Sequence, residues 1–202
     1  MSASNLRLAI IDSGGANIAS LRYAVERLGV NAELTIDPKV IRNATHVILP
    51  GVGSAADCMA RLQRAGLVEV IAQVTQPFLG ICVGMQLLFD SSEEGNVQCF
   101  GLLPGRVQRF ADRDGLPVPH IGWNTLNVLR TSPLLANFTR DDYVYYVHSF
   151  CAPISDNTLA TTDYGNAFSA VVQRDNIFGA QFHPERSAKA GAKLIQNFLA
   201  LK

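Results

Sequence analysis

The first half of the chain repeats one pattern, in which an apolar run of strand type is followed by a glycine-containing turn and by apolar residues at helical spacing. Residues 6–12 (LRLAIID) form such a run, and Ile18, Leu21, Val25 and Leu28 then recur on one helix face. A helix after a buried strand returns the chain to the start of a parallel neighbour. The pattern therefore constrains this half of the chain to strand–helix units.

The pattern recurs along the next seventy or so residues. Residues 32–36 and 45–51 are strand candidates, and residues 55–66 are compatible with a helix. Residues 67–74 then favour another helix, and residues 77–81 a fully buried strand. We therefore expect an α/β fold with a mainly parallel central sheet and helices on both of its faces.

The second half has shorter strand candidates separated by turn residues, so some of its strands should be antiparallel. The candidates are residues 105–111, 119–128, 142–150, 159–165, 167–175 and 177–185. A short helix is expected within residues 131–138, capped by Thr131 or Ser132, and an amphipathic helix closes the chain behind a Ser187 cap.

Composition narrows the class of protein. The 202 residues are enough for one sizeable core, so we expect one domain over residues 1–202. Lys plus Arg and Asp plus Glu both number 17, without long runs of one sign, which argues against a nucleic-acid or membrane binder. Four cysteines stand singly, without zinc-site spacing, which favours reduced thiols. With no membrane span expected, we predict a soluble, cytoplasmic protein that holds no metal.

Cys82 stands between two glycines in GICVG, where a buried strand meets a helix. A cysteine in such a turn projects from the carboxyl end of the strand, and the helix N-terminus favours its thiolate. The glycines relieve the crowding of a sharp turn, as in nucleophile elbows. The alternative is that Cys82 packs as a small apolar residue, as free cysteines commonly do.

A nucleophilic cysteine requires a base, and His46, His120, His148 and His183 are the histidines available. His183 ends a strand candidate in HPE, where Glu185 is placed to hold the imidazole in one tautomer. His46 lies inside an apolar strand, which favours a structural role. His148 is the rival base but has no carboxylate close by in sequence, and HPE taken alone is also compatible with an ordinary polar turn.

Acyl chemistry also requires donors for the developing oxyanion. The backbone N–H of Val83 follows the cysteine and is the first candidate. Residues 50–54 (PGVGS) end the neighbouring strand, and their glycines allow a peptide N–H to turn toward the site or away from it. No Lys-Ser/Thr pair follows, which argues against a nucleotide-binding loop there.

These separated segments resemble the class I glutamine amidotransferases, whose GxCxG and HPE motifs occur here in the same order. The resemblance implies a flavodoxin-like α/β fold and a glutaminase without cofactor. In that role Cys82 attacks the side-chain amide of L-glutamine, His183 is general base and acid, and Glu185 orients His183. Ammonia then leaves, and the glutamyl thioester is hydrolysed.

Within this family the chain is similar, nearly end to end, to the glutaminase subunits of imidazole glycerol phosphate synthases of histidine biosynthesis. The implied partner is a (β/α)8-barrel cyclase, in a heterodimer that uses the ammonia to make imidazole glycerol phosphate and an aminoimidazole carboxamide ribotide. The resemblance implies an oxyanion peptide at Val52, substrate contacts by Gly53, Gln86, Ser149 and Phe150, and a partner surface with Asn17, His120, Trp123, Asn124 and Tyr145.

The sequence departs from the family pattern at two places, and two other functions remain as alternatives. DSGGAN replaces the usual DYGxGN pattern around Asn17, and Arg186 stands where lysine is common. One alternative is another enzyme with this type of site, either a different class I glutaminase subunit or a cysteine hydrolase that needs no partner. The other is an idle binding subunit, which would be expected to have lost Cys82, His183 or Glu185.

Overall fold

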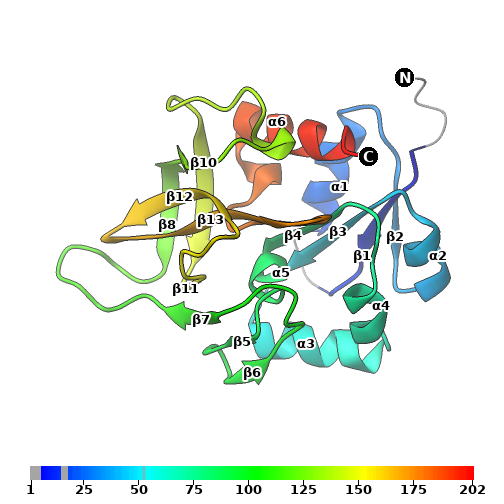
Figure 1. Ribbon diagram of the computed structural model, residues 1–202, viewed down its shortest axis with the longest axis horizontal. Coiled ribbons are helices and arrows are strands. Elements are labelled where there is room, and N and C mark those ends of the chain that lie inside the picture. The colour runs from blue at the N-terminus through cyan, green and yellow to red at the C-terminus, as the bar shows by residue number, and fades with distance from the viewer. Residues whose placement is uncertain (1–5, 15–17, 52) are drawn as a thin grey trace.

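The computed structural model describes residues 6–14, 18–51 and 53–202, and these residues form an eight-stranded sheet with two smaller sheets beside it (Figure 1). The large sheet has the order β2-β1-β3-β4-β14-β13-β12-β9. Its strands are β1 (Leu8–Ile11), β2 (Ala32–Thr35), β3 (His46–Gly51), β4 (Phe78–Cys82), β9 (Asn127–Val128), β12 (Thr158–Tyr164), β13 (Asn166–Arg174) and β14 (Ile177–Ala180).

The first five strands of that order are mutually parallel, and the remaining ones are antiparallel. The parallel strands β1, β3, β4 and β14 are buried along their whole length, as their continuous apolar runs require. The carboxyl ends of β3, β4 and β14 meet at one edge of the sheet, which places Gly51, Cys82 and the segment after Ala180 together.

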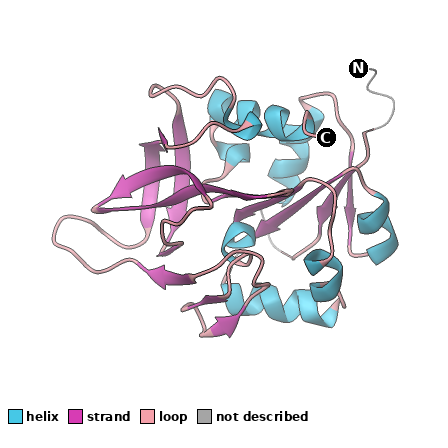
Figure 2. Ribbon diagram, viewed as in Figure 1, coloured by secondary structure: helices cyan, strands magenta, loops and turns pink. Residues whose placement is uncertain are grey.

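Helices cover both faces of the sheet (Figure 2). In Figure 1, α1 and α6 lie on one face, and α3 and α4 lie on the other. The helices are α1 (Ile18–Glu26), α2 (Pro38–Asn43), α3 (Ala55–Arg64), α4 (Val68–Ala72), α5 (Val83–Gln86) and α6 (Ala188–Leu199), with 3-10 turns η2 (Pro133–Leu135) and η3 (Pro184–Arg186). The buried side chains form one apolar cluster between these layers.

Two smaller sheets come from the middle of the chain. Strands β8 (His120–Thr125) and β10 (Tyr143–His148) form an antiparallel pair. The second sheet has the order β11-β7-β5-β6, from β5 (Ser91–Ser92), β6 (Val97–Gln98), β7 (Arg106–Arg109) and β11 (Phe150–Cys151). Both lie beside the carboxyl edge of the parallel strands and so can wall a site there (Figure 1).

The expected mainly parallel sheet with antiparallel strands in the C-terminal half is confirmed. Residues 119–128 divide between two sheets as β8 and β9, and β14 ends at Ala180 rather than continuing into HPE. The sequence prediction missed α2, β5 and β6. The capping residue of η2 is Ser132, one of its two expected candidates.

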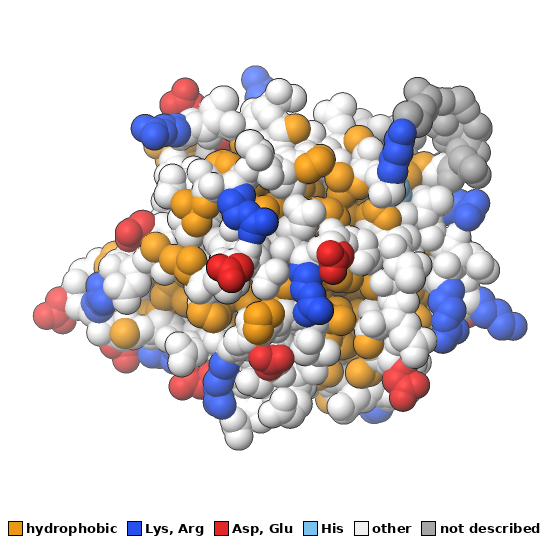
Figure 3. Space-filling model, viewed as in Figure 1, with side chains coloured by type: hydrophobic (Ala, Val, Ile, Leu, Met, Phe, Trp, Pro, Cys, Tyr) orange, Lys and Arg blue, Asp and Glu red, His pale blue; other side chains and the backbone are white. Residues whose placement is uncertain are grey.

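Positive and negative side chains are interspersed on the face drawn in Figure 3, without a field of one sign. No helix in the described part of the chain has the length and apolar character needed to cross a membrane.

Candidate active site

Cys82 ends β4 in a strained backbone conformation. Its φ of 54° and ψ of −113° lie outside the regions that residues with a side chain ordinarily adopt, and such strain is held only where the surrounding structure enforces it. The helix α5 begins at the next residue, so the chain turns sharply from strand to helix. The N–H of Val83 opens this helix, and the first N–H groups of a helix have no partner within it.

Glycines permit this turn because the elbow lies against the neighbouring strand. A Cβ atom on Gly84 would lie 2.0 Å from the carbonyl oxygen of Leu49, and one on Gly80 would lie 2.5 Å from the carbonyl oxygen of Gly84. Gly51 pairs with Cys82 in the sheet, and a Cβ there would lie 2.2 Å from the Gly84 nitrogen. Gly51 and Gly84 are therefore needed for the close contact between β3 and the elbow, and Gly80 for the close approach within the elbow.

His183 and Glu185 follow β14, which is the parallel neighbour of β4. The Nδ1 atom of His183 lies 2.8 Å from Oε1 of Glu185, and the two side chains are only 5% and 3% exposed. The Cys82 side chain lies close enough to His183 to raise the pKa of the imidazole, and both residues line the same cavity. The structure thus brings the cysteine, the histidine and the glutamate together in the order nucleophile, base and orienting group.

The charge of His183 depends on these two neighbours. Burial lowers the pKa of His183, but hydrogen bonds to Cys82 and Glu185, with the charges of both, outweigh burial and raise it to about 10. His183 is therefore protonated at neutral pH. The imidazolium can therefore donate a proton beside the cysteine.

Backbone contacts hold the HPE turn in place. The N–H of His183 donates to the Tyr145 carbonyl at 2.9 Å, and the hydroxyl of Ser187 donates to the His183 carbonyl at 2.7 Å. The same hydroxyl accepts from the Tyr145 N–H at 2.9 Å. Ser187 was expected to cap α6, but its side chain makes no capping bond. It is fully buried and links the HPE turn to β10 instead.

The amides of Gln86 and Gln181 continue from Cys82 toward β11. Gln86 Nε2 donates to the Phe150 carbonyl at 2.9 Å and to Gln181 Oε1 at 3.1 Å. Gln181 Nε2 in turn donates to the Cys82 sulfur at 3.9 Å. Sequence reasoning missed Gln181; the available signal was a single amide in the otherwise apolar stretch IFGAQF.

The rival histidine His148 uses both ring nitrogens inside the protein. Its Nδ1 lies 2.7 Å from the Phe150 carbonyl, and its Nε2 lies 3.2 Å from Nδ1 of His120. Burial lowers the pKa of His148 to about 3 and that of His120 to about 4. Both rings are therefore neutral at physiological pH, and His148 is poorly suited to act as the base. His46 is also buried, and its ring packs against Phe198.

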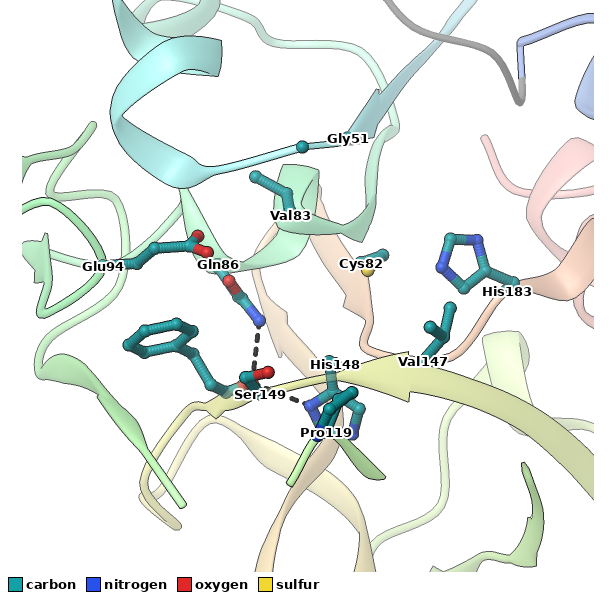
Figure 4. A pocket seen from close by; sticks show the side chains of 12 residues that line it. Gly51, Cys82, Val83, Gln86, Glu94, Pro119, Val147, His148, Ser149 and His183 are labelled. Carbon is teal, nitrogen blue, oxygen red and sulfur yellow. Dashed lines mark hydrogen bonds between the residues drawn. The ribbon is translucent and has the colours of Figure 1, made fainter. Parts of the chain in front are cut away.

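A cavity of about 330 Å³ opens in front of Cys82, large enough for one amino acid. Figure 4 shows Gln86 and Glu94 on the left of the view and His183 on the right. Glu94 was not predicted as a site residue; its Oε2 accepts from the Ala55 N–H at 2.7 Å. The lining residues are Gly51, Gly53, Cys82, Val83, Gln86, Glu94, Pro119, Val147, His148, Ser149, Phe150 and His183.

The residues expected at a partner surface divide between the two sides of the β8–β10 pair. Trp123 and Tyr145 lie opposite each other, with ring centroids 5.8 Å apart, and Trp123 is 52% exposed. His120 is instead buried between the rings of Tyr146 and Tyr164, so its side chain does not reach that surface. This contradicts the expectation for His120.

Asn124 also faces the inner side of this pair. Its Nδ2 donates to the carbonyl of Asp163 at 2.9 Å, and its Oδ1 accepts from the N–H of Thr125. Asn17 and Val52 lie outside the described residues. Among the described residues, no group of three or more His, Cys, Asp or Glu side chains is placed to hold a metal ion.

Comparison with known proteins assigns the family. A model of the glutamine amidotransferase class-I family matches residues 9–201. The chain belongs to this family. The resemblance seen in the GxCxG and HPE motifs is thus confirmed, and the chain is a glutamine amidotransferase.

Curated members of the class I family show high similarity along nearly the whole chain. The imidazole glycerol phosphate synthase subunit HisH of Xylella fastidiosa (strain Temecula1) is 51% identical over 194 residues, which are 96% of this chain and 97% of that protein. HisH of Xanthomonas campestris pv. campestris (strain 8004) has the same identity and coverage. This similarity agrees with the finer resemblance seen in the sequence.

Solved structures of other proteins share the fold. The structure of PurLQS from Thermotoga maritima superposes with a TM-score of 0.75 at 23% identity, covering 96% of this chain and 98% of that one. A crystal structure of a glutamine amidotransferase gives a TM-score of 0.73 at 17% identity, with coverage of 95% and 96%. At these identities the likeness concerns the fold alone.

Proposed function

We propose that this chain is the glutaminase subunit of an imidazole glycerol phosphate synthase and acts in the cytoplasm. It hydrolyses L-glutamine and passes the ammonia to a (β/α)8-barrel cyclase in a heterodimer. The observation that carries the proposal is the buried contact of Cys82, His183 and Glu185 beside a cavity of amino-acid size. The similarity to HisH subunits supports the choice of synthase.

The reaction follows from the order of the three groups. The Cys82 sulfur attacks the side-chain amide carbon of glutamine, and the oxyanion that forms accepts from the Val83 N–H. His183 gives its proton to the amide nitrogen, the C–N bond breaks and ammonia leaves. Water, deprotonated by His183, then splits the thioester into glutamate and free Cys82. A second oxyanion donor stays a prediction at the peptide of Val52.

The cavity offers acceptors for the α-ammonium group of glutamine at a distance from the sulfur. Both N–H groups of Gln86 donate to acceptors within the protein, the Phe150 carbonyl and Gln181 Oε1. Its amide oxygen can therefore accept from a ligand. The Glu94 carboxylate lines the same side of the cavity and supplies a negative charge. Gly53, Ser149 and Phe150 complete this end and are proposed to contact the substrate backbone.

The partner surface is proposed on the outer side of the β8–β10 pair. Trp123 and Tyr145 share this side with Ile121 and Tyr143, two residues away on the same strands. Ile121 is 60% exposed and Tyr143 is 55% exposed. A contiguous exposed apolar face with aromatic residues is typical of protein interfaces. The site lies at the end of the same strand, because His148 and Ser149 line the cavity. A cyclase docked there would receive ammonia close to its source.

A glutaminase assay with and without a purified cyclase and its nucleotide ligand tests the proposal. We expect slow glutamate release by the chain alone, a rise by orders of magnitude with the liganded cyclase, and loss of both in Cys82→Ala. Cys99→Ala is the matched control, because that cysteine does not line the cavity. A rate that ignored the cyclase would contradict the synthase assignment, and a rate that survived Cys82→Ala would contradict the mechanism.

A further inference from the structure

Gln181 is a buried amide that the reaction described above does not use. Its side chain is fully buried, immediately after the apolar strand β14 and two residues before His183. A primary amide in such surroundings is tolerated when its donors and acceptor find partners. The partners it has are Gln86, which donates to its oxygen, and the sulfur of Cys82, which accepts from its nitrogen.

The direction of these hydrogen bonds is fixed by a backbone carbonyl. The Phe150 carbonyl can only accept, so the Gln86 atom that lies 2.9 Å from it must be the amide nitrogen. The same nitrogen lies 3.1 Å from the Gln181 amide, which must therefore present its oxygen there. The NH2 group of Gln181 is thereby turned toward the Cys82 sulfur, at a distance within reach of the larger sulfur atom.

We propose that Gln181 is a positioning residue for Cys82, whose amide N–H holds the sulfur through a second contact besides that with His183. This inference rests on the proposed function, in which Cys82 is the nucleophile. A thiolate beside one charged donor can follow that donor when the donor moves, whereas two donors fix the sulfur in place. Gln181 is itself held through Gln86 to the Phe150 carbonyl, so the sulfur is fixed relative to the substrate end of the cavity.

Two substitutions of Gln181 test the role of its amide group. Gln181→Glu keeps an oxygen that can accept from Gln86 but replaces the donor to sulfur by a carboxylate oxygen. Gln181→Met keeps an unbranched side chain of similar length but removes both amide groups. If Gln181 only filled space, Gln181→Met would leave the reactivity of Cys82 unchanged, because methionine fills a similar volume.

The test is the pH profile of Cys82 alkylation by iodoacetamide in the full chain, followed at the Cys82 peptide by mass spectrometry. Only the thiolate reacts, so the midpoint of the profile reports how strongly the protein favours it. We expect the midpoint to rise by about one pH unit in Gln181→Met and further in Gln181→Glu. Gln173→Met is the control, because that glutamine bonds to Ser132 and Asp175, away from the cavity.

The outcomes separate this inference from the function. If Gln181→Met and Gln181→Glu both melt cooperatively and have the wild-type alkylation midpoint, the role of Gln181 is overturned. The proposed function is tested separately, by the glutaminase activity. If the Gln181 variants do not fold, Gln86→Met is measured instead. That change frees the Gln181 amide to rotate, so a smaller upward shift is expected, and an unchanged midpoint again overturns the inference. The titratable groups of the site, His183, Glu185, His148 and Glu94, are intact in every variant, and only Gln181→Glu adds one.

Discussion

At the scale of single residues, the charge on His183 is the quantity on which the proposed chemistry depends. The carboxylate of Glu185 lies 2.8 Å from its Nδ1 and is itself buried. Glu185→Gln keeps a hydrogen-bond acceptor for the ring but removes the charge that favours the imidazolium. We expect a loss of about 10²- to 10⁴-fold in the glutaminase rate with little change in KM, measured as glutamate release in the presence of the cyclase. A rate close to wild type would argue that Glu185 only fills space.

His183 also makes the stability of the fold depend on pH. The pKa of His183 is about 10 in the folded protein against 6.5 as its ordinary value, so the folded state holds the proton more tightly. The stabilisation from His183 is therefore complete below pH 6.5, falls as pH rises, and is lost above pH 10. Urea unfolding of wild type and Glu185→Gln across pH 6–10 measures it. We expect their difference in free energy to shrink as pH rises; a constant difference would contradict the assignment.

The site residues that sequence predicted are those with a motif around them. Cys82 and His183 stand in short patterns whose chemistry is specific when they occur together. Gln181 and Glu94 carry no such pattern, because the role of each depends on a contact with a segment far away in sequence. Gln181 bonds across 95 residues to Gln86, and Glu94 across 39 residues to Ala55. Neither pairing can be inferred from spacing along one chain.

At the scale of elements, the elbow between β4 and α5 depends on Gly84. A Cβ there would meet the Leu49 carbonyl oxygen at 2.0 Å, and because that oxygen belongs to the backbone of β3 it cannot rotate away. We expect Gly84→Ala to destabilise the fold by about 3 kcal/mol or more, because β3 or the elbow must move. Chemical denaturation measures the loss.

The control for Gly84→Ala is Gly29→Ala. Gly29 has a φ of +79° but open space around it, so its substitution costs only the left-handed backbone, about 1–2 kcal/mol. Glutaminase activity should remain in Gly29→Ala and disappear in Gly84→Ala. Equal losses of stability in the two variants would show that the elbow tolerates a side chain.

The turn after β14 depends on Ser187, whose hydroxyl joins the His183 carbonyl to the Tyr145 N–H. Ser187→Ala leaves two buried backbone groups without that partner. We therefore expect a loss of about 2–4 kcal/mol in stability and a fall in the glutaminase rate, because His183 is less firmly placed. Ser132→Ala removes a comparable hydroxyl from the start of η2 and should cost about 1 kcal/mol without affecting the rate. Equal rates in both variants would contradict this role.

Element lengths were harder to predict than element types. Helix α5 ends at Gln86 although the apolar residues continue, because the next carbonyls are used elsewhere. The Leu87 and Leu88 carbonyls accept from the N–H groups of Phe100 and Leu103. Strands β5 and β6 have only two residues each, which is too short for an alternation of apolar and polar residues to be recognised in the sequence. In each case a distant segment decides where the element stops.

At the scale of the whole molecule, the sequence does not tell which side of the β8–β10 pair faces outward. Both sides carry aromatic residues, since Tyr146 alternates with Tyr143 and Tyr145 on one strand. The fold decides it by packing Tyr146 and His120 against Phe168 and Tyr164 in the core. What is left outside is an exposed apolar surface that includes Ile121, Trp123 and Tyr143.

A charged residue placed on that outer surface should weaken binding of the cyclase without destabilising the fold. Ile121 is 60% exposed, so Ile121→Glu should leave the melting temperature unchanged, whereas burial of the carboxylate against a cyclase should weaken binding by at least about 10²-fold. Ile36→Glu is the matched control, because Ile36 is 55% exposed just beyond the edge strand β2. Titration calorimetry measures the affinity, and the activation of glutamine hydrolysis should fall in parallel. If both glutamates bind the cyclase as wild type does, the partner docks on another face.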